Sequence, residues 1–258
     1  MRSLPLDSRT LIEVTRAAAY LLDAECTVAD IRSTNDRVDA VNLLTQATAR
    51  LGAEVALMVS VMQSGTSAQE HHMLVNCDPT WCFEYEALRA TNEDPWLDYA
   101  LSHTEPIRST DLVGQLGQSP ATVDLAARYG FSSAVIVPIS AAGAASPRGM
   151  LCLGSSRAGY FERDGFVAFK VLARAIAMEL HEWWLSRMAG ELICQTGLTD
   201  ADMTLLKLES QGCTTKVIAR QLGLSTAQVD YRFGRINGRL GVPNRTVASR
   251  LVASLGLL

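Results

Sequence analysis

The last sixty residues of the chain carry a spacing of glycines and capping residues that few folds share. Gly212 lies fourteen positions after Leu198, and the run 222–225 (Leu-Gly-Leu-Ser) begins ten positions later. A glycine in the left-handed region ends a helix and turns the chain, and a serine directly after such a turn caps the next helix. The spacing therefore predicts a helix-turn-helix, a motif that places its second helix in the major groove of DNA.

Apolar periodicity extends this motif to a predicted bundle of four helices. The first helix begins at the Thr199 cap and ends before Gly212, and the second is expected over residues 214–222. The third begins after Ser225 and the fourth after Asn244. Each carries apolar residues three or four positions apart, which is the periodicity of a helix that buries one face.

The third predicted helix has one apolar face, and its other residues are polar. Four apolar residues recur along it at helical spacing: Val229, Phe233, Ile236 and Leu240. Residues off this stripe, and cations on the second helix, are free to meet DNA. The predicted DNA contacts are Lys216, Arg220, Thr226, Gln228, Asp230, Tyr231, Arg232, Arg235 and Arg239. Asp230 would repel phosphate, so we interpret it as tolerated near the rim, with a contact to cytosine N4 as the alternative.

Charge is distributed unevenly between the two ends of the chain. From residue 196 onward there are eight Lys or Arg against four Asp or Glu, a local net charge of +4. The whole chain has a net charge of −4, which leaves −8 on residues 1–195. A basic module attached to an acidic domain suits nucleic-acid binding, because Lys and Arg neutralise phosphates. The alternative is a plain helical bundle whose basic face is only solvated.

The remaining composition predicts a soluble protein without a metal or a cofactor. No apolar run approaches the ~18 residues of a transmembrane helix, and a signal-peptide core is missing, so we expect a cytoplasmic location and no membrane partner. Six cysteines and four histidines are scattered without ligand spacing, which predicts neither disulfides nor a metal site. Motifs such as G-x-S-x-G, the P-loop and H-E-x-x-H are absent, so we expect no enzyme and no catalytic residues.

The larger N-terminal part alternates predicted helices and strands. Helices are expected over residues 12–22, 38–51 and 161–187, and strands over 55–62, 72–77, 133–139 and 149–155. Helices on both faces of a mainly antiparallel sheet give an α+β protein: an α/β/α sandwich able to hold a ligand, followed by the four-helix DNA-binding domain.

A chain of 258 residues is long enough for two domains. We place a ligand-sensing domain at residues 1–187, a linker at 188–197 and the helix-turn-helix domain at 198–258.

A cluster of aromatic and acidic side chains follows the second predicted strand. Trp81, Tyr85, Asp94 and Trp96 fall within sixteen positions. An indole N–H, a phenol and a carboxylate can fix the polar head of a ligand. Its apolar tail would then lie against alternate residues of the first strand, Leu57, Val59 and Val61. The structural alternative is that Asp94 caps a helix starting at Pro95, and that Trp81 and Tyr85 are an ordinary core pair.

The two halves together resemble the LuxR-type quorum-sensing regulators. The resemblance covers about residues 35–258 and rests on Trp81, Tyr85 four residues later, Asp94-Pro95, Gly130 before a strand, and the helix-turn-helix. It implies a transcription regulator that binds an N-acyl-homoserine lactone or a related acylated molecule and forms a homodimer on double-stranded DNA. RNA polymerase is a further candidate partner.

The same resemblance implies roles for three residues of the cluster. Trp81 would donate to the carbonyl of the signal's lactone ring, Asp94 would accept from its amide N–H, and Tyr85 would pack beside them. The alternative is an orphan regulator of this type, which is ligand-independent or answers to a protein partner.

Three positions depart from the family's pattern near the ligand head group. Ser109 stands where a tryptophan is usual, Cys77 where a tyrosine donor is common, and Cys152 where a serine or threonine often contacts the ligand. Exchange of a large aromatic for serine removes apolar contact of about 2–3 kcal/mol if the same ligand bound unchanged. We therefore expect ordinary acyl-homoserine lactones to bind weakly, or a ligand with a different or larger head group.

Overall fold

The computed structural model describes residues 9–33, 37–63, 69–89, 94–116, 120–140 and 148–258. The chain divides into two compact units. The N-terminal unit contains residues up to Ser60, His72–Ser140 and Arg148–His181, and Glu182–Leu258 belongs to the C-terminal unit.

A five-stranded sheet, counted over the described residues, has the strand order β2-β1-β5-β4-β3. The strands are β1 (Val55–Gln63), β2 (Gln69–Val75), β3 (Ile107–Arg108), β4 (Ser133–Ser140) and β5 (Arg148–Ser155). The four predicted strands correspond to β1, β2, β4 and β5. Strand β4 pairs antiparallel with β3 and with β5, and Ser133 lies opposite Ser155. All but one residue in each of β4 and β5 is buried, because both faces of the sheet are covered.

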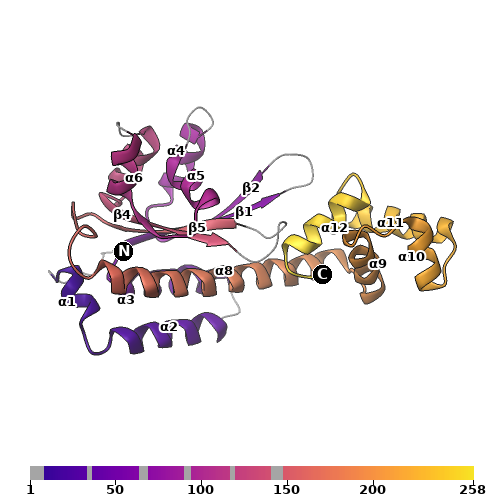
Figure 1. The fold of residues 1–258 in the computed structure, drawn as a ribbon, viewed down its shortest axis with the longest axis horizontal. Coiled ribbons are helices and arrows are strands. Elements are labelled where there is room, and N and C mark those ends of the chain that lie inside the picture. The colour runs from indigo at the N-terminus through magenta and orange to yellow at the C-terminus, as the bar shows by residue number, and fades with distance from the viewer. Residues whose placement is uncertain (1–8, 34–36, 64–68, 90–93, 117–119, 141–147) are drawn as a thin grey trace. The chain divides into compact units, whose positions relative to one another are not determined.

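Helices cover the two faces of this sheet (Figure 1). The helices α4 (Thr80–Arg89), α5 (Pro95–Ser102) and α6 (Ser109–Leu116) lie over one face. Helix α3 (Arg37–Leu51) and the first part of α8 lie over the other, and α7 (Ala121–Arg128) packs against α4. The predicted α+β class and α/β/α sandwich are confirmed.

Two helices precede α3 and add a layer to the sandwich. They are α1 (Leu11–Thr15) and α2 (Tyr20–Ser33), so the prediction of one helix over residues 12–22 is wrong. Arg16 ends α1, and α2 then continues beyond the predicted end because its later turns pack on α3. Arg32 donates two hydrogen bonds to Glu179 of α8, and Arg50 of α3 pairs with Asp30 at 3.0 Å. These ion pairs hold α2 in place.

The long helix α8 (Phe166–Thr196) differs from its prediction at both ends. It begins after residue 161 and continues to Thr196, through all but the last residue of the interdomain linker predicted at residues 188–197. That stretch contains no proline, and the first left-handed residue after it is Gly197, with φ of +59°. Its apolar side chains also pack on the end of the chain, in a cluster made by Leu185, Met188, Ala189, Leu192, Leu251, Leu255 and Leu257. The tertiary contacts therefore favour a continued helix.

The C-terminal unit contains the four predicted helices. They are α9 (Asp200–Ser210), α10 (Thr215–Leu222), α11 (Thr226–Leu240) and α12 (Arg245–Ser254). The side chains of Thr199, Ser225 and Asn244 cap α9, α11 and α12. Gly223 and Gly241 adopt the left-handed conformation at the ends of α10 and α11. No helix in the described parts of the chain combines the length and the apolar character needed to cross a membrane.

Candidate ligand pocket and DNA-binding surface

The predicted head-group residues lie together in a buried cluster on α4 and at the start of α5. The rings of Trp81 and Tyr85 stack, with centroids 4.5 Å apart and planes inclined by 15°. The Tyr85 hydroxyl donates a hydrogen bond to Asp94 Oδ2. All three residues are less than a tenth exposed, so water is largely excluded from the cluster.

Asp94 also caps helix α5. Its Oδ1 accepts hydrogen bonds from the backbone N–H of Trp96 at 3.0 Å and of Leu97 at 3.4 Å. Pro95 occupies the first helical position, where a missing N–H is tolerated. A carboxylate has about four acceptor positions, and three are occupied by Tyr85 and the two N–H groups. The structural role considered for Asp94 is therefore present. Its carboxylate has no fourth donor among the residues that the structure describes, which makes an acceptor position available to a ligand N–H.

Two buried indole N–H groups in this region have no hydrogen-bond partner among the described residues. They belong to Trp81 and Trp96. The Trp96 ring packs edge-on against Phe131, with centroids 6.2 Å apart. A buried donor without an acceptor costs about 1–3 kcal/mol, so a ligand carbonyl at either indole would be stabilised. Trp96 lies outside the predicted ligand set, and its place two residues after Asp94 is the signal that could have included it.

The residues predicted to line the ligand tail are buried on the first strand: Leu57, Val59 and Val61. A side chain at Gly154 of β5 would collide with Val55 and Phe131. Val55 and Gly154 therefore lie on the same face of the sheet as Phe131. This is the face that Trp96 covers, because its ring packs on Phe131. Because side chains alternate along a strand, the three predicted residues and Cys152 lie on that same face.

The three departures from the family's pattern have different surroundings. Burial raises the pKa of the Cys152 thiol well above its usual value, and the charge of nearby Asp94 adds to the effect. Burial also raises the pKa of Cys77 to about 11, with a contribution from Cys82, so both thiols are protonated at neutral pH. Ser109 is buried, and its Oγ accepts a hydrogen bond from the N–H of Ala134 at 3.2 Å.

Two cavities of the N-terminal unit lie away from this cluster. One of about 110 Å³ is lined by Tyr20, Arg50 and Tyr160 among others. A larger one of about 780 Å³ is lined by residues of α1, α2 and α8, by Arg108 and by residues 162–165. Neither is lined by a residue predicted to bind the ligand. Among the residues that the structure describes, no group of three His, Cys, Asp or Glu could hold a metal ion.

All residues predicted to contact DNA except Arg232 are exposed on α10 and α11: Lys216, Arg220, Thr226, Gln228, Asp230, Tyr231, Arg235 and Arg239. Tyr231 is 74% exposed, and Arg232 is half-buried. The side-chain oxygen of Gln228 accepts a hydrogen bond from the N–H of Ser225 at 2.8 Å. The Gln228 side-chain oxygen therefore stabilises the start of α11.

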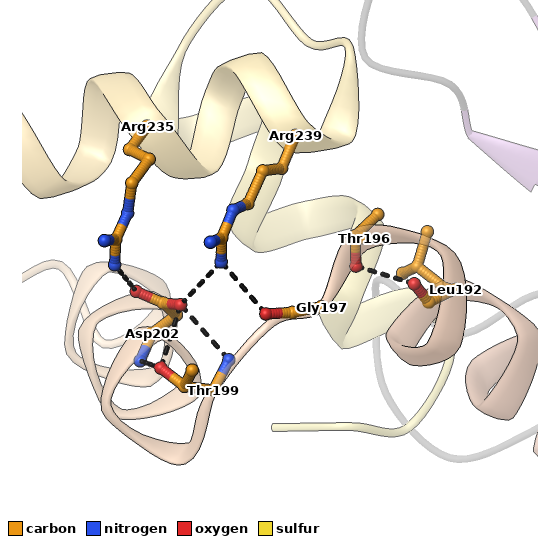
Figure 2. A network of polar contacts seen from close by, with 7 residues as sticks. All are labelled: Leu192, Thr196, Gly197, Thr199, Asp202, Arg235 and Arg239. Carbon is orange, nitrogen blue, oxygen red and sulfur yellow. Dashed lines mark hydrogen bonds and ion pairs between the residues drawn. The ribbon is translucent and has the colours of Figure 1, made fainter.

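Arg235 and Arg239, two of these predicted DNA contacts, are engaged within the protein (Figure 2). Arg235 Nη2 lies 3.3 Å from Asp202 Oδ1, and Arg239 Nη1 lies 3.4 Å from Asp202 Oδ2. Arg239 Nη1 also donates to the carbonyl oxygen of Gly197 at 2.9 Å. Asp202 lies three residues after the Thr199 cap, and its contact with the two arginines could not be predicted because no local sequence pattern links it to α11.

Solved structures of other proteins share this fold at low sequence identity. The crystal structure of Escherichia coli SdiA has a TM-score of 0.71 and 13% identity, over 92% of this chain and 98% of that chain. A structure of SdiA in complex with octanoyl-rac-glycerol has a TM-score of 0.69 and 13% identity, over 93% and 96%. CepR2 from Burkholderia cenocepacia, described as an N-acylhomoserine lactone dependent LuxR family transcription factor, has a TM-score of 0.56 and 16% identity, over 67% and 98%.

Two sequence families match the chain. Residues 36–182 match the autoinducer binding domain, and residues 196–252 match the bacterial regulatory proteins of the luxR family. No curated protein sequence matches the chain. Both matched domains belong to transcription regulators and not to enzymes. The chain is therefore a member of the LuxR family, in which an autoinducer-binding domain precedes a C-terminal helix-turn-helix domain that binds DNA.

Proposed function

We propose that this LuxR-type regulator binds an N-acyl-homoserine lactone or a related acylated small molecule, and that the ligand controls its binding to DNA. The observation that carries the proposal is the buried polar cluster around Asp94. The indole N–H of Trp81 has no partner among the described residues, and Asp94 has one unused acceptor position. A carbonyl and an amide N–H on one ligand would satisfy both.

The head group of the ligand is the less determined part. Ser109 is small, and the Cys77 and Cys152 thiols are weak donors, so polar recognition depends on Trp81, Asp94 and Trp96. A lactone ring is one head group that these residues could hold. Another is a glycerol ester, since SdiA is similar in fold and its structure contains octanoyl-rac-glycerol.

The proposal is tested by calorimetric titration of the purified chain with acyl-homoserine lactones of increasing acyl length and with octanoyl-rac-glycerol. We expect at least one series to bind, and Trp81→Phe to weaken it about tenfold, the equivalent of one hydrogen bond. Trp183→Phe, a tryptophan exchange on α8, is the matched control and should bind like the wild type. Equal affinity for Trp81→Phe and the wild type would contradict the assignment of Trp81.

A ligand-independent regulator is the second candidate function. It is favoured by the hydrogen bonds from Tyr85, Trp96 and Leu97, which already hold Asp94 inside the protein. A domain that satisfies its own carboxylate can fold without a ligand. Mass spectrometry of small molecules extracted from protein purified out of its native host separates the two candidates, because a ligand-dependent regulator should retain a bound acylated molecule.

We further propose that the chain acts as a homodimer. Val167 and Val171 of α8 are 72% and 59% exposed, and Leu21 of α2 is 65% exposed. All three line the open cavity of about 780 Å³. A second copy of the chain would bury these apolar side chains. Two helix-turn-helix domains also bind DNA more tightly than one.

The dimer is tested by light scattering at micromolar concentration. Val167→Lys/Val171→Lys should shift the chain toward the monomer. Phe83→Lys, which alters an equally exposed apolar side chain on α4, should not. A wild-type monomer with and without DNA would contradict the proposal. RNA polymerase remains a predicted partner. The cytoplasm remains the predicted location, because a DNA-binding regulator has to reach the chromosome.

A further inference from the structure

Asp202 is a buried carboxylate at the start of α9 with four hydrogen-bond donors around it (Figure 2). The backbone N–H and the hydroxyl of Thr199 lie 3.1 and 2.9 Å from its Oδ2. Arg235 and Arg239 supply the other two donors, from α11. Asp202 is only 1% exposed, so these contacts replace the water that the carboxylate loses on folding.

Arg239 connects this carboxylate to a third element. Its Nη1 also donates to the carbonyl oxygen of Gly197, one residue beyond the end of α8. The last carbonyl groups of a helix lack partners inside the helix, and a cation near them is favourable. One guanidinium group therefore joins the end of α8, the start of α9 and the recognition helix α11.

The other cations of the predicted DNA surface differ from this pair. For Lys216, Arg220 and Arg232 the structure gives no ion pair with any described residue. On the α11 helical wheel, Arg232, Arg235 and Arg239 lie on one side of the buried stripe, and Asp202 engages only the last two. Tyr231 lies opposite the buried stripe and is 74% exposed.

We propose that Arg235 and Arg239 are positioning residues, which orient α11 through Asp202 and Gly197, and that they do not contact DNA. This inference rests on the DNA-binding role of the domain and is independent of the ligand. If both arginines turned toward phosphate, Asp202 would keep only its contacts to Thr199 in a buried environment. Removing the partners of a buried charge is strongly unfavourable, so phosphate contacts fall to Lys216, Arg220 and Arg232.

The test compares full-length variants by thermal unfolding and by affinity for a random-sequence DNA duplex at several salt concentrations. The salt slope of the affinity counts the phosphates that the protein neutralises, at about 0.9 for each contact. Arg239→Gln and Asp202→Asn should lower the unfolding temperature by several degrees and leave the salt slope unchanged. The control Lys216→Gln/Arg220→Gln, which changes two exposed cations, should reduce the slope and leave the unfolding temperature unchanged.

Two results would overturn the proposal. One is a reduced slope in Arg239→Gln with an unchanged unfolding temperature. The other is tighter DNA binding with a steeper slope in Asp202→Asn, which would show that the freed arginines turn to phosphate. If Arg239→Gln does not fold, that failure supports the positioning role. The salt slope of DNA binding is then measured on Arg239→Lys instead. If the wild type does not bind DNA at all, the DNA-binding role itself is contradicted. The unfolding temperatures would still test the positioning role, because they are measured without DNA.

Discussion

At the scale of single residues, the same side chain often serves both stability and the proposed function. Asp94 caps α5, accepts a hydrogen bond from Tyr85 and keeps one acceptor position open. The sequence presents the cap and the ligand contact as alternatives. The structure shows the cap, and the two roles are compatible because a carboxylate has more acceptor positions than the cap uses.

Substitutions at Asp94 should separate these two roles. Asn caps helices about as well as Asp, so Asp94→Asn should keep the stability of the N-terminal unit and weaken ligand binding, because the amide cannot accept from both sides. Asp94→Ala removes the cap and should cost about 1 kcal/mol of unfolding free energy as well. Urea unfolding and calorimetry check the two effects. Equal stability losses in the two variants would argue against the cap.

Glu54 gives a prediction about acid stability. Burial tends to raise the pKa of this carboxyl, but hydrogen bonds from Ser156 and Ser155 and the charge of Arg157 hold it below its usual value. A folded pKa below the unfolded one stabilises the protein above the unfolded pKa of about 4.3, and this stability is lost as pH falls through the folded pKa. Glu54→Gln should therefore be less stable than the wild type at pH 7. The difference should shrink toward pH 3, and a constant difference across this range would contradict the assignment.

At the scale of elements, α8 decides where the DNA-binding domain begins. The family match starts at residue 196, and the glycine at 197 suggests the same boundary. The structure instead assigns Glu182–Leu258 to one unit, because the last turns of α8 pack on α12 and on the residues that follow it. These turns contribute a part of the core that lies far from α12 in the sequence.

A fragment comparison tests this boundary. Residues 182–258 should fold more stably than residues 198–258, by at least about 2 kcal/mol, because the shorter fragment loses the apolar contacts of Leu185, Met188 and Leu192. It also loses the Gly197 carbonyl that Arg239 contacts. Urea unfolding of both fragments measures the difference. Identical midpoints would show that the end of α8 is a linker, as the sequence alone suggests.

At the scale of the whole molecule, two units with separate cores should respond differently to a ligand. A ligand that binds only the folded N-terminal unit stabilises that unit by about 2.7 kcal/mol at a concentration one hundred times its dissociation constant. Differential scanning calorimetry should therefore show two unfolding transitions. An acylated ligand should shift only the transition of the N-terminal unit, which is the one that is missing in the 182–258 fragment. A ligand that shifted the transition of the isolated fragment would be binding outside the autoinducer-binding domain.

The sequence by itself determined the features that depend on neighbouring residues. The caps at Thr199, Ser225 and Asn244, the left-handed glycines and the helical periodicity define the C-terminal bundle, because a cap or a turn is formed within a few positions. Runs rich in Val, Leu and Ile likewise located four strands, and the spacing of Trp81, Tyr85 and Asp94 located a cluster that is buried in the structure.

Only the tertiary structure decided the features that join distant parts of the chain. Arg235 and Arg239 belong to the exposed basic set by periodicity alone, yet Asp202, more than thirty positions earlier, engages both. The continuation of α8 and the additional layer formed by α2 likewise depend on residues far away in the sequence. The same holds for the indole N–H of Trp96, which has no acceptor in the described part of the chain. Local patterns report which face of a helix is polar. What a polar side chain contacts is settled by which elements the fold brings beside it.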